Sequence, residues 1–66
     1  MTKTQIFKTI KDANGLADEL KKYKVGSKEY NEISQAIGWT LDSLVGGEGF
    51  SLHHSERTGH YWVKFS

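Results

Sequence analysis

The sequence predicts an α+β domain of order α-α-β-β, a helical hairpin packed on a C-terminal antiparallel β-hairpin. Two observations lead to this prediction. Apolar residues recur at helical spacing over residues 2–44, and after Gly49 they alternate with polar residues as in a strand. The chain has 66 residues, which allows a single small domain over residues 1–66 with one modest core.

The first helix is predicted from about Thr2 to Tyr23. Thr2 and Gln5 fit a capping box at its start. The helical phase passes through Asn14–Gly15 without a slip and leaves Gly15 on the outer side. The predicted apolar face consists of Ile6, Ile10, Ala13, Ala17 and Leu20, widened by Phe7, Leu16 and Tyr23.

A strand is the alternative for residues 3–11. The segment TQIFKTI is rich in β-branched residues, and DANG could be a turn that starts a shorter helix at about Asp12 or Asn14. The order would then be β-α-α-β-β with a three-stranded sheet. The unbroken helical phase favours the helix.

The second helix is predicted to begin after the break at KVGS. Gly26 ends the first helix and Ser27 is the N-cap of the second. The glycines of VGGEG, residues 45–49, end it, and the short connection makes the two helices antiparallel neighbours. Its apolar face consists of Tyr30, Ile33, Ile37, Leu41 and Leu44.

The C-terminal segment is predicted to be a β-hairpin with Gly59 at a loop position of positive φ. A three-residue loop would set Lys64 beside Phe50 and Leu52. A two-residue loop (Thr58–Gly59) or a four-residue loop (56–59) avoids this, and both stay open. The inner face then carries Phe50, Leu52, Tyr61, Val63 and Phe65, with a partly buried His54 near the loop.

The outer face of this hairpin is the first candidate binding site, because it is polar, mildly basic and centred on a tryptophan. The alternative is a solvated sheet face on which the tryptophan covers its cross-strand neighbours. The residues proposed to contact a partner here are His53, Arg57, His60, Trp62 and Lys64.

Trp39 is the second candidate. On a helical wheel it lies opposite the apolar face of the second helix, among Lys28, Glu32, Gln35, Asp42 and Ser43. If that side is exposed, Trp39 would anchor a partner; the alternative is that the first helix or the glycine-rich loop covers it.

Metal and catalytic sites are not predicted. His53 and His60 would be diagonal neighbours in the four-residue-loop register, which supplies two ligands at best, and solvated histidines are the simpler interpretation. The sequence has no nucleophile–base motif, no phosphate-binding loop followed by a helix, and too few residues for a deep pocket. We therefore expect a non-enzymatic protein without a cofactor.

Charge and composition narrow the function classes. The net charge is only +1, with a basic segment (1–25) followed by an acidic one (26–49), which weakens a dedicated nucleic-acid role. The lysines of the first helix could steer an acidic partner or simply solubilise its surface. The chain has no cysteine, no long apolar run and no signal-peptide pattern, so we expect a cytoplasmic protein, and the initial Met1 suggests a complete small product.

The leading hypothesis is a small binding protein that acts by contact with another protein, as an inhibitor or adaptor of the kind that viruses and mobile elements use. The competing hypothesis is a nucleic-acid-binding module that uses the outer face of the hairpin, with the lysines of the first helix following the backbone. A homodimer that buries Trp39 or Trp62 is a third hypothesis, and no membrane contact is expected.

Overall fold

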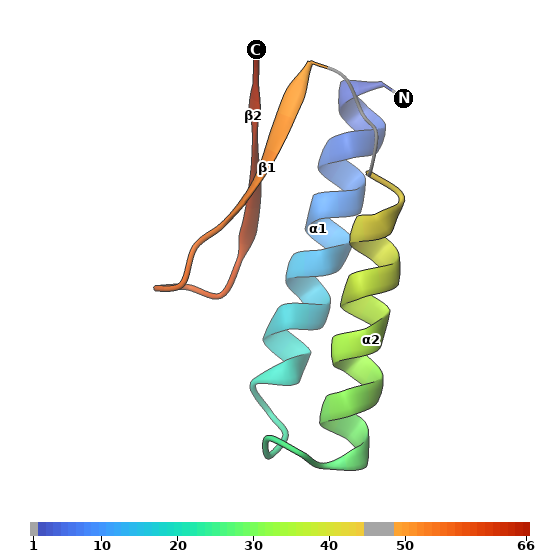
Figure 1. Cartoon of the computed structure of the whole chain (residues 1–66), viewed down its shortest axis with the longest axis vertical. Helices are drawn as coiled ribbons and strands as arrows, with labels where there is room; N and C mark the ends of the chain where they lie inside the picture. Colours follow the sequence, from blue (N-terminus) through green and yellow to red (C-terminus); the bar gives the residue numbers. More distant parts are fainter. Residues whose placement is uncertain (1, 45–48) are drawn as a thin grey trace.

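The computed structural model describes residues 2–44 and 49–66 and has the predicted order α-α-β-β. Two helices, α1 (Lys3–Leu20) and α2 (Lys28–Asp42), precede two antiparallel strands, β1 (Phe50–His54) and β2 (Tyr61–Phe65). Figure 1 shows the hairpin, α1 and α2 side by side along the long axis of the molecule, with α1 in the middle.

Helix α1 is continuous, so the alternative of a strand over residues 3–11 is wrong. It begins with the predicted capping box, in which the Thr2 backbone N–H donates to Gln5 Oε1 over 2.8 Å and the Gln5 N–H donates to Thr2 Oγ1 over 3.2 Å. The helix also continues through Asn14–Gly15, where the alternative placed the start of a shorter helix. The cap and the unbroken apolar face together outweigh the β-branched residues near the N-terminus.

Helix α2 begins as predicted, at Ser27, whose hydroxyl accepts a hydrogen bond from the Tyr30 N–H over 3.2 Å. Gly26, with φ of 90°, lies in the turn between the helices. Residues 45–48 of the predicted glycine-rich ending lie outside the described residues.

The core lies between the two helices and the inner face of the hairpin. Phe50, Tyr61, Val63 and Phe65 pack against a cluster formed by Ile6, Ile10 and Leu44. Apart from residues 1 and 45–48, the buried side chains are all apolar; they are Ile6, Ile10, Ala13, Ala17, Ile37 and Leu44. The core is therefore thin, and most of the predicted apolar face of α2 is only half-buried.

The hairpin has the four-residue loop, one of the two predicted alternatives. Leu52 pairs with Val63 and His53 with Trp62. The loop is closed by hydrogen bonds from the Ser55 N–H to the His60 carbonyl (2.9 Å) and from the Gly59 N–H to the Ser55 carbonyl (2.8 Å), and Gly59 has the predicted positive φ. This register puts the predicted apolar side chains on the inner face.

The prediction that His54 is partly buried is wrong, because its side chain is exposed. Within the described residues, the helix backbones approach the hairpin backbone through α1 and β2, and from β1 only Phe50 packs against the helical core. The inner side chains of β1 beyond Phe50 therefore lack cover. Leu52 is 39% exposed, and His54 instead packs its ring on Tyr61, with 4.5 Å between ring centroids.

Two helical glycines have room for a side chain, so alanine in their place should stabilise the fold. A Cβ atom at Gly15 or Gly38 would meet nothing within 4 Å. We expect Gly15→Ala and Gly38→Ala each to raise the free energy of unfolding by about 0.5–1 kcal/mol, measured by urea denaturation. Gly59→Ala is the control: it should lower stability, because φ is 75° and a Cβ would approach Lys21 Cε at 3.4 Å. A loss of stability at Gly15 or Gly38 would contradict this.

Candidate interaction surfaces

Three of the five candidate residues of the hairpin, His53, Trp62 and Lys64, lie together on its outer face. The rings of His53 and Trp62 lie nearly parallel, at an angle of 17° and with centroids 4.3 Å apart. This contact follows from the register, which sets the two residues directly opposite each other. Ser51 pairs with Lys64 in the next rung, and its hydroxyl lies 2.9 Å from His53 Nε2. We call Ser51, His53, Trp62 and Lys64 the Trp62 surface.

The Trp62 surface is accessible. Trp62 is 48% exposed, and His53 and Lys64 are also exposed. The structure is compatible with both a structural and a binding role for Trp62. Its ring covers the cross-strand neighbour His53, and about half of its surface is still exposed to solvent. Arg57 lies in the loop, exposed, beyond the end of the strands.

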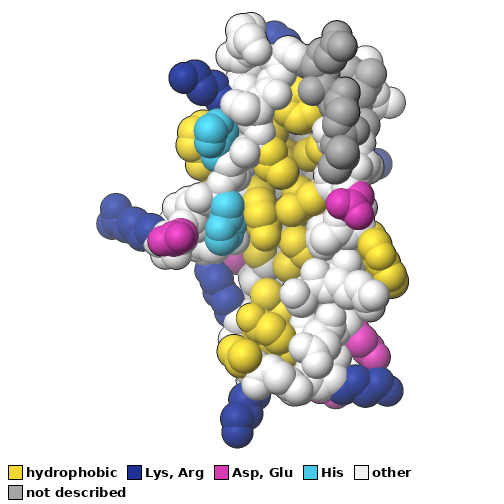
Figure 2. Space-filling view, viewed as in Figure 1, with side chains coloured by type: hydrophobic (Ala, Val, Ile, Leu, Met, Phe, Trp, Pro, Cys, Tyr) yellow, Lys and Arg dark blue, Asp and Glu magenta, His cyan; other side chains and the backbone are white. Residues whose placement is uncertain are grey.

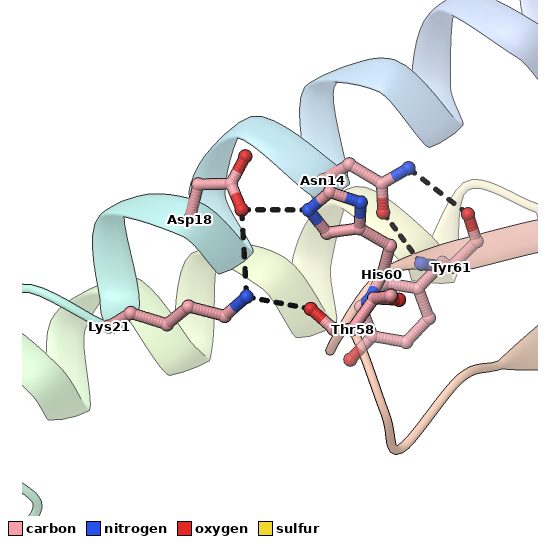
Figure 3. Close-up of polar contacts among 6 residues, drawn as sticks. All are labelled: Asn14, Asp18, Lys21, Thr58, His60 and Tyr61. Atoms are coloured by element: carbon pink, nitrogen blue, oxygen red, sulfur yellow. Dashed lines mark hydrogen bonds and ion pairs between the residues drawn. The ribbon is translucent and has the colours of Figure 1, made fainter.

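His60 is directed away from this surface, which differs from the sequence prediction. Its Nε2 lies 2.7 Å from Asp18 Oδ1 on α1 (Figure 3). His60 immediately precedes β2, the strand beside α1, and there the carboxylate offers a closer partner than the outer face. His53 and His60 thus have separate partners, and the structure contains no group of three or more His, Asp or Glu side chains suited to a metal over residues 2–44 and 49–66.

Trp39 forms a separate surface on α2. It is 66% exposed, so neither α1 nor the described part of the loop covers it. Its helical neighbours Glu32, Gln35 and Asp42 are also exposed, and Glu32 is paired with Lys28 at 3.9 Å. The structure therefore does not bring Trp39 together with the hairpin candidates, because α1 lies between α2 and the hairpin (Figure 1).

A line of contacts between the α1 side of the helical hairpin and the β2 side of the β-hairpin was not predicted from the sequence. We call it the seam; its residues are Lys3, Phe7, Asn14, Asp18 and Lys21 on one side and Thr58, His60, Tyr61 and Phe65 on the other. The Asn14 side chain hydrogen-bonds both backbone groups of Tyr61: its Nδ2 donates to the carbonyl over 3.0 Å, and its Oδ1 accepts from the N–H over 2.6 Å (Figure 3). One turn further along α1, Asp18 meets His60, and Lys21 donates to the Thr58 carbonyl over 2.6 Å. These contacts attach the loop end of the hairpin to the helix.

At the other end of the seam the contacts are aromatic. Phe7 packs edge-on against Phe65 with 5.4 Å between centroids, and Lys3 Nζ lies 5.0 Å from the Phe65 ring centroid. The spacing Lys3, Phe7, Asn14, Asp18, Lys21 is itself helical and runs beside the apolar face. In the sequence, this spacing is the one sign that these residues share a contact face. It does not predict the contact by itself, because polar residues in this pattern are also typical of a solvated helix surface.

The seam gives the fold a pH dependence that can be tested. The hydrogen bond from His60, together with Lys21 and Lys22, lowers the pKa of Asp18 in the folded state. A lowered pKa means that Asp18 stabilises the fold above the pKa it has in the unfolded chain and loses this effect as pH falls through the folded value. We expect the stability difference between the native protein and Asp18→Asn to be full at neutral pH, to begin to fall near the unfolded pKa of about 4, and to vanish only below the lowered pKa of the folded state.

The measurement is the free energy of unfolding of both proteins across pH, by urea denaturation. Glu19→Asn is the control, because Glu19 contacts the neighbouring Lys22 but no residue of the hairpin. A difference between wild type and Asp18→Asn that persisted unchanged to pH 2 would contradict the assignment.

Comparison with protein-family models, with curated proteins and with solved structures finds no match to this chain. None of the helices in the described residues has the length and apolar character needed to cross a membrane.

Proposed function

We propose that this chain is a small non-enzymatic binding protein that acts by contact with another protein, as an inhibitor or adaptor. The observation that supports this most is the exposure of two tryptophans outside the core, Trp39 at 66% and Trp62 at 48%. Tryptophan is enriched among the side chains that dominate protein–protein binding energy, and exposed large apolar groups mark interaction sites. The cytoplasmic location that the sequence predicts remains part of this hypothesis.

The Trp62 surface is the better anchor of the two. Trp62 is held by the stacked His53 ring and by its place in a strand, so little side-chain freedom is lost when a partner covers it. Trp39 stands on a single helix without an aromatic neighbour among the described contacts. We therefore assign the main contact to Trp62 and a flanking one to Trp39.

The expected result of Trp62→Ala is the loss of the partner with the fold retained. The measurement is affinity capture from a cell lysate in the presence of nuclease, followed by mass spectrometry, with circular dichroism of the variant. Trp62→Phe is the matched control, because it keeps a flat ring against His53. A melting temperature that falls as steeply as the binding would instead show that Trp62 mainly holds the hairpin, and would contradict the assignment.

Nucleic-acid binding is the second candidate, and the parallel His53–Trp62 stack beside Lys64 favours it specifically. Such a platform can stack an unpaired base, with the lysine near a phosphate. The surroundings argue against it, because Lys21 and Lys22 are engaged with Asp18 and Glu19 and the net charge is only +1.

A titration with a single-stranded oligonucleotide separates the two candidates. In a Trp39→Phe background the tryptophan fluorescence reports Trp62 alone. Quenching that disappears steeply with added salt would establish the nucleic-acid function, because phosphate contacts release counterions. The protein-contact proposal expects no quenching and a captured protein whose binding changes little with salt.

A further inference from the structure

Strand β1 is an open edge of the sheet. Among the residues that the structure describes, the sheet has two strands, and on the far side of β2 the Asn14 side chain is hydrogen-bonded to the backbone groups of Tyr61. Over residues 2–44 and 49–66, no helix or strand other than β2 brings its backbone beside β1. Within the described residues, α1 therefore covers the β2 edge at Tyr61, and the β1 edge is left open to pair with another strand.

The register identifies which backbone groups are free. Hydrogen bonds run from the Ser55 N–H to the His60 carbonyl and from the Ser66 N–H to the Gly49 carbonyl, so odd-numbered residues of this segment face β2. The N–H and C=O groups of Phe50, Leu52 and His54 therefore point away from it. No hydrogen bond to these outward groups is found within the described part of the chain.

The open edge adjoins exposed apolar surface. Figure 2 shows a continuous band of hydrophobic side chains between the histidines of the hairpin and α2. Leu52, on the inner face of β1, is 39% exposed. A strand added at this edge would place its own inward side chains beside that band, so main-chain pairing and apolar burial would occur together.

Strand β1 also lacks the features that keep edges apart. Its sequence, FSLHH, contains no lysine, no proline and no acidic residue, and it carries no formal charge with neutral histidines. Natural proteins commonly protect an exposed edge with one of these. Two copies of this strand can therefore meet without like-charge repulsion.

We propose that β1 pairs antiparallel with β1 of a second copy of this chain, about a two-fold axis at Leu52, to form a four-stranded sheet. Leu52 then faces its own equivalent, and Phe50 faces His54 of the second copy. These pairs lie on the inner face and bring the outward backbone groups into register. On the outer face, Ser51 faces His53, which repeats between copies the hydroxyl–imidazole contact seen within one.

In this pairing, each β1 side chain faces a side chain of the second copy with which it can make a favourable contact. This is why we prefer a second copy to an unrelated strand. An aromatic residue meets an imidazole on the inner face, as in the His54–Tyr61 contact, and the central rung is aliphatic. An isolated two-stranded hairpin is weak, and a sheet of more strands is more stable. The proposal is independent of the Trp62 surface, which the four-stranded sheet leaves exposed.

The test is amide hydrogen exchange followed by NMR, together with sedimentation equilibrium, across the micromolar to millimolar range. We expect the mass to rise toward that of a dimer with concentration. The amides of Leu52 and His54 should become protected over the same range, whereas those of Ser51 and His53 are protected throughout. A chain that stays monomeric at millimolar concentration would overturn the proposal.

Chemical synthesis of the chain with N-methyl-Leu52 isolates the edge, because this N–H points away from β2. We expect it to abolish the dimer and to leave the circular dichroism and the binding of any Trp62-dependent partner unchanged. Leu52→Val, which keeps the N–H, is the matched control and should still dimerise. A dimer that survives N-methylation but is lost in Trp39→Ala or Trp62→Ala would place the interface elsewhere and refute the pairing at β1.

Discussion

Ile10→Ala should lower the free energy of unfolding by about 2–5 kcal/mol, the largest effect that we expect from a single substitution. Ile10 is 7% exposed and lies in the cluster with Ile6 and Leu44, against which the inner face of the hairpin packs. A core in a chain of this size supplies roughly 3–5 kcal/mol in total. We therefore expect the variant to be largely unfolded at room temperature.

The measurement is urea denaturation followed by circular dichroism at 222 nm, a wavelength that reports the helices. Val25→Ala is the control, because Val25 is 76% exposed and its truncation should change stability by no more than about 0.5 kcal/mol. A loss of less than about 1 kcal/mol at Ile10 would mean that the cluster is not the centre of the core.

The helices could be predicted because their signals are local. The Thr2–Gln5 capping box and the Ser27 cap each depend on side chains within one turn, and the structure has both. The helical phase through Gly15 likewise needed no knowledge of distant residues. The predicted buried positions of α1 were confirmed at Ile6, Ile10, Ala13 and Ala17, whereas Leu20 is half-buried.

The hairpin was predicted only to within two registers, because the alternation of apolar residues is the same in both. What distinguishes them is the loop, in which Ser55 and His60 close a four-residue connection. The local sequence does not favour the four-residue loop over the two-residue loop. Contacts from α1 help to decide it, since Lys21 and Asn14 bind backbone groups at Thr58 and Tyr61.

The same long-range contacts explain where the site prediction and the structure differ. His60 was assigned to the outer face from its place in the alternation, but its orientation depends on Asp18, which is 42 positions away in the sequence. The exposure of Trp39 and Trp62 depends on what the other elements leave uncovered. A helical wheel gives the direction of a side chain from its own axis and says nothing of what lies beyond it.

Asn14 is the residue that attaches α1 to the hairpin most directly. Its side chain takes the place of a neighbouring strand at the edge of β2. Its amide has one donor and one acceptor group, the same pair that a backbone peptide offers, and both are used on Tyr61. This attaches the hairpin to α1 at a half-buried position. It also leaves β1 as the edge available for pairing.

Asn14→Leu should therefore lower the free energy of unfolding by about 1–3 kcal/mol for each Tyr61 group left unpaired away from water. The measurement is urea denaturation, combined with NMR shifts of the hairpin amides. Leucine keeps a similar volume and favours the helix, so any loss reflects the missing hydrogen bonds.

Asn14→Asp gives the finer test. It keeps the acceptor for the Tyr61 N–H but removes the donor and sets a carboxylate against the carbonyl oxygen. We expect it to be destabilised at neutral pH and partly rescued by acid, because the protonated carboxyl can donate again. Equal stability of Asn14→Asp and the native protein at neutral pH would show that the Asn14 donor contributes nothing, and that the hairpin is held to α1 by the other contacts, which include the Phe65 packing, the Asp18–His60 pair and the Lys21 hydrogen bond.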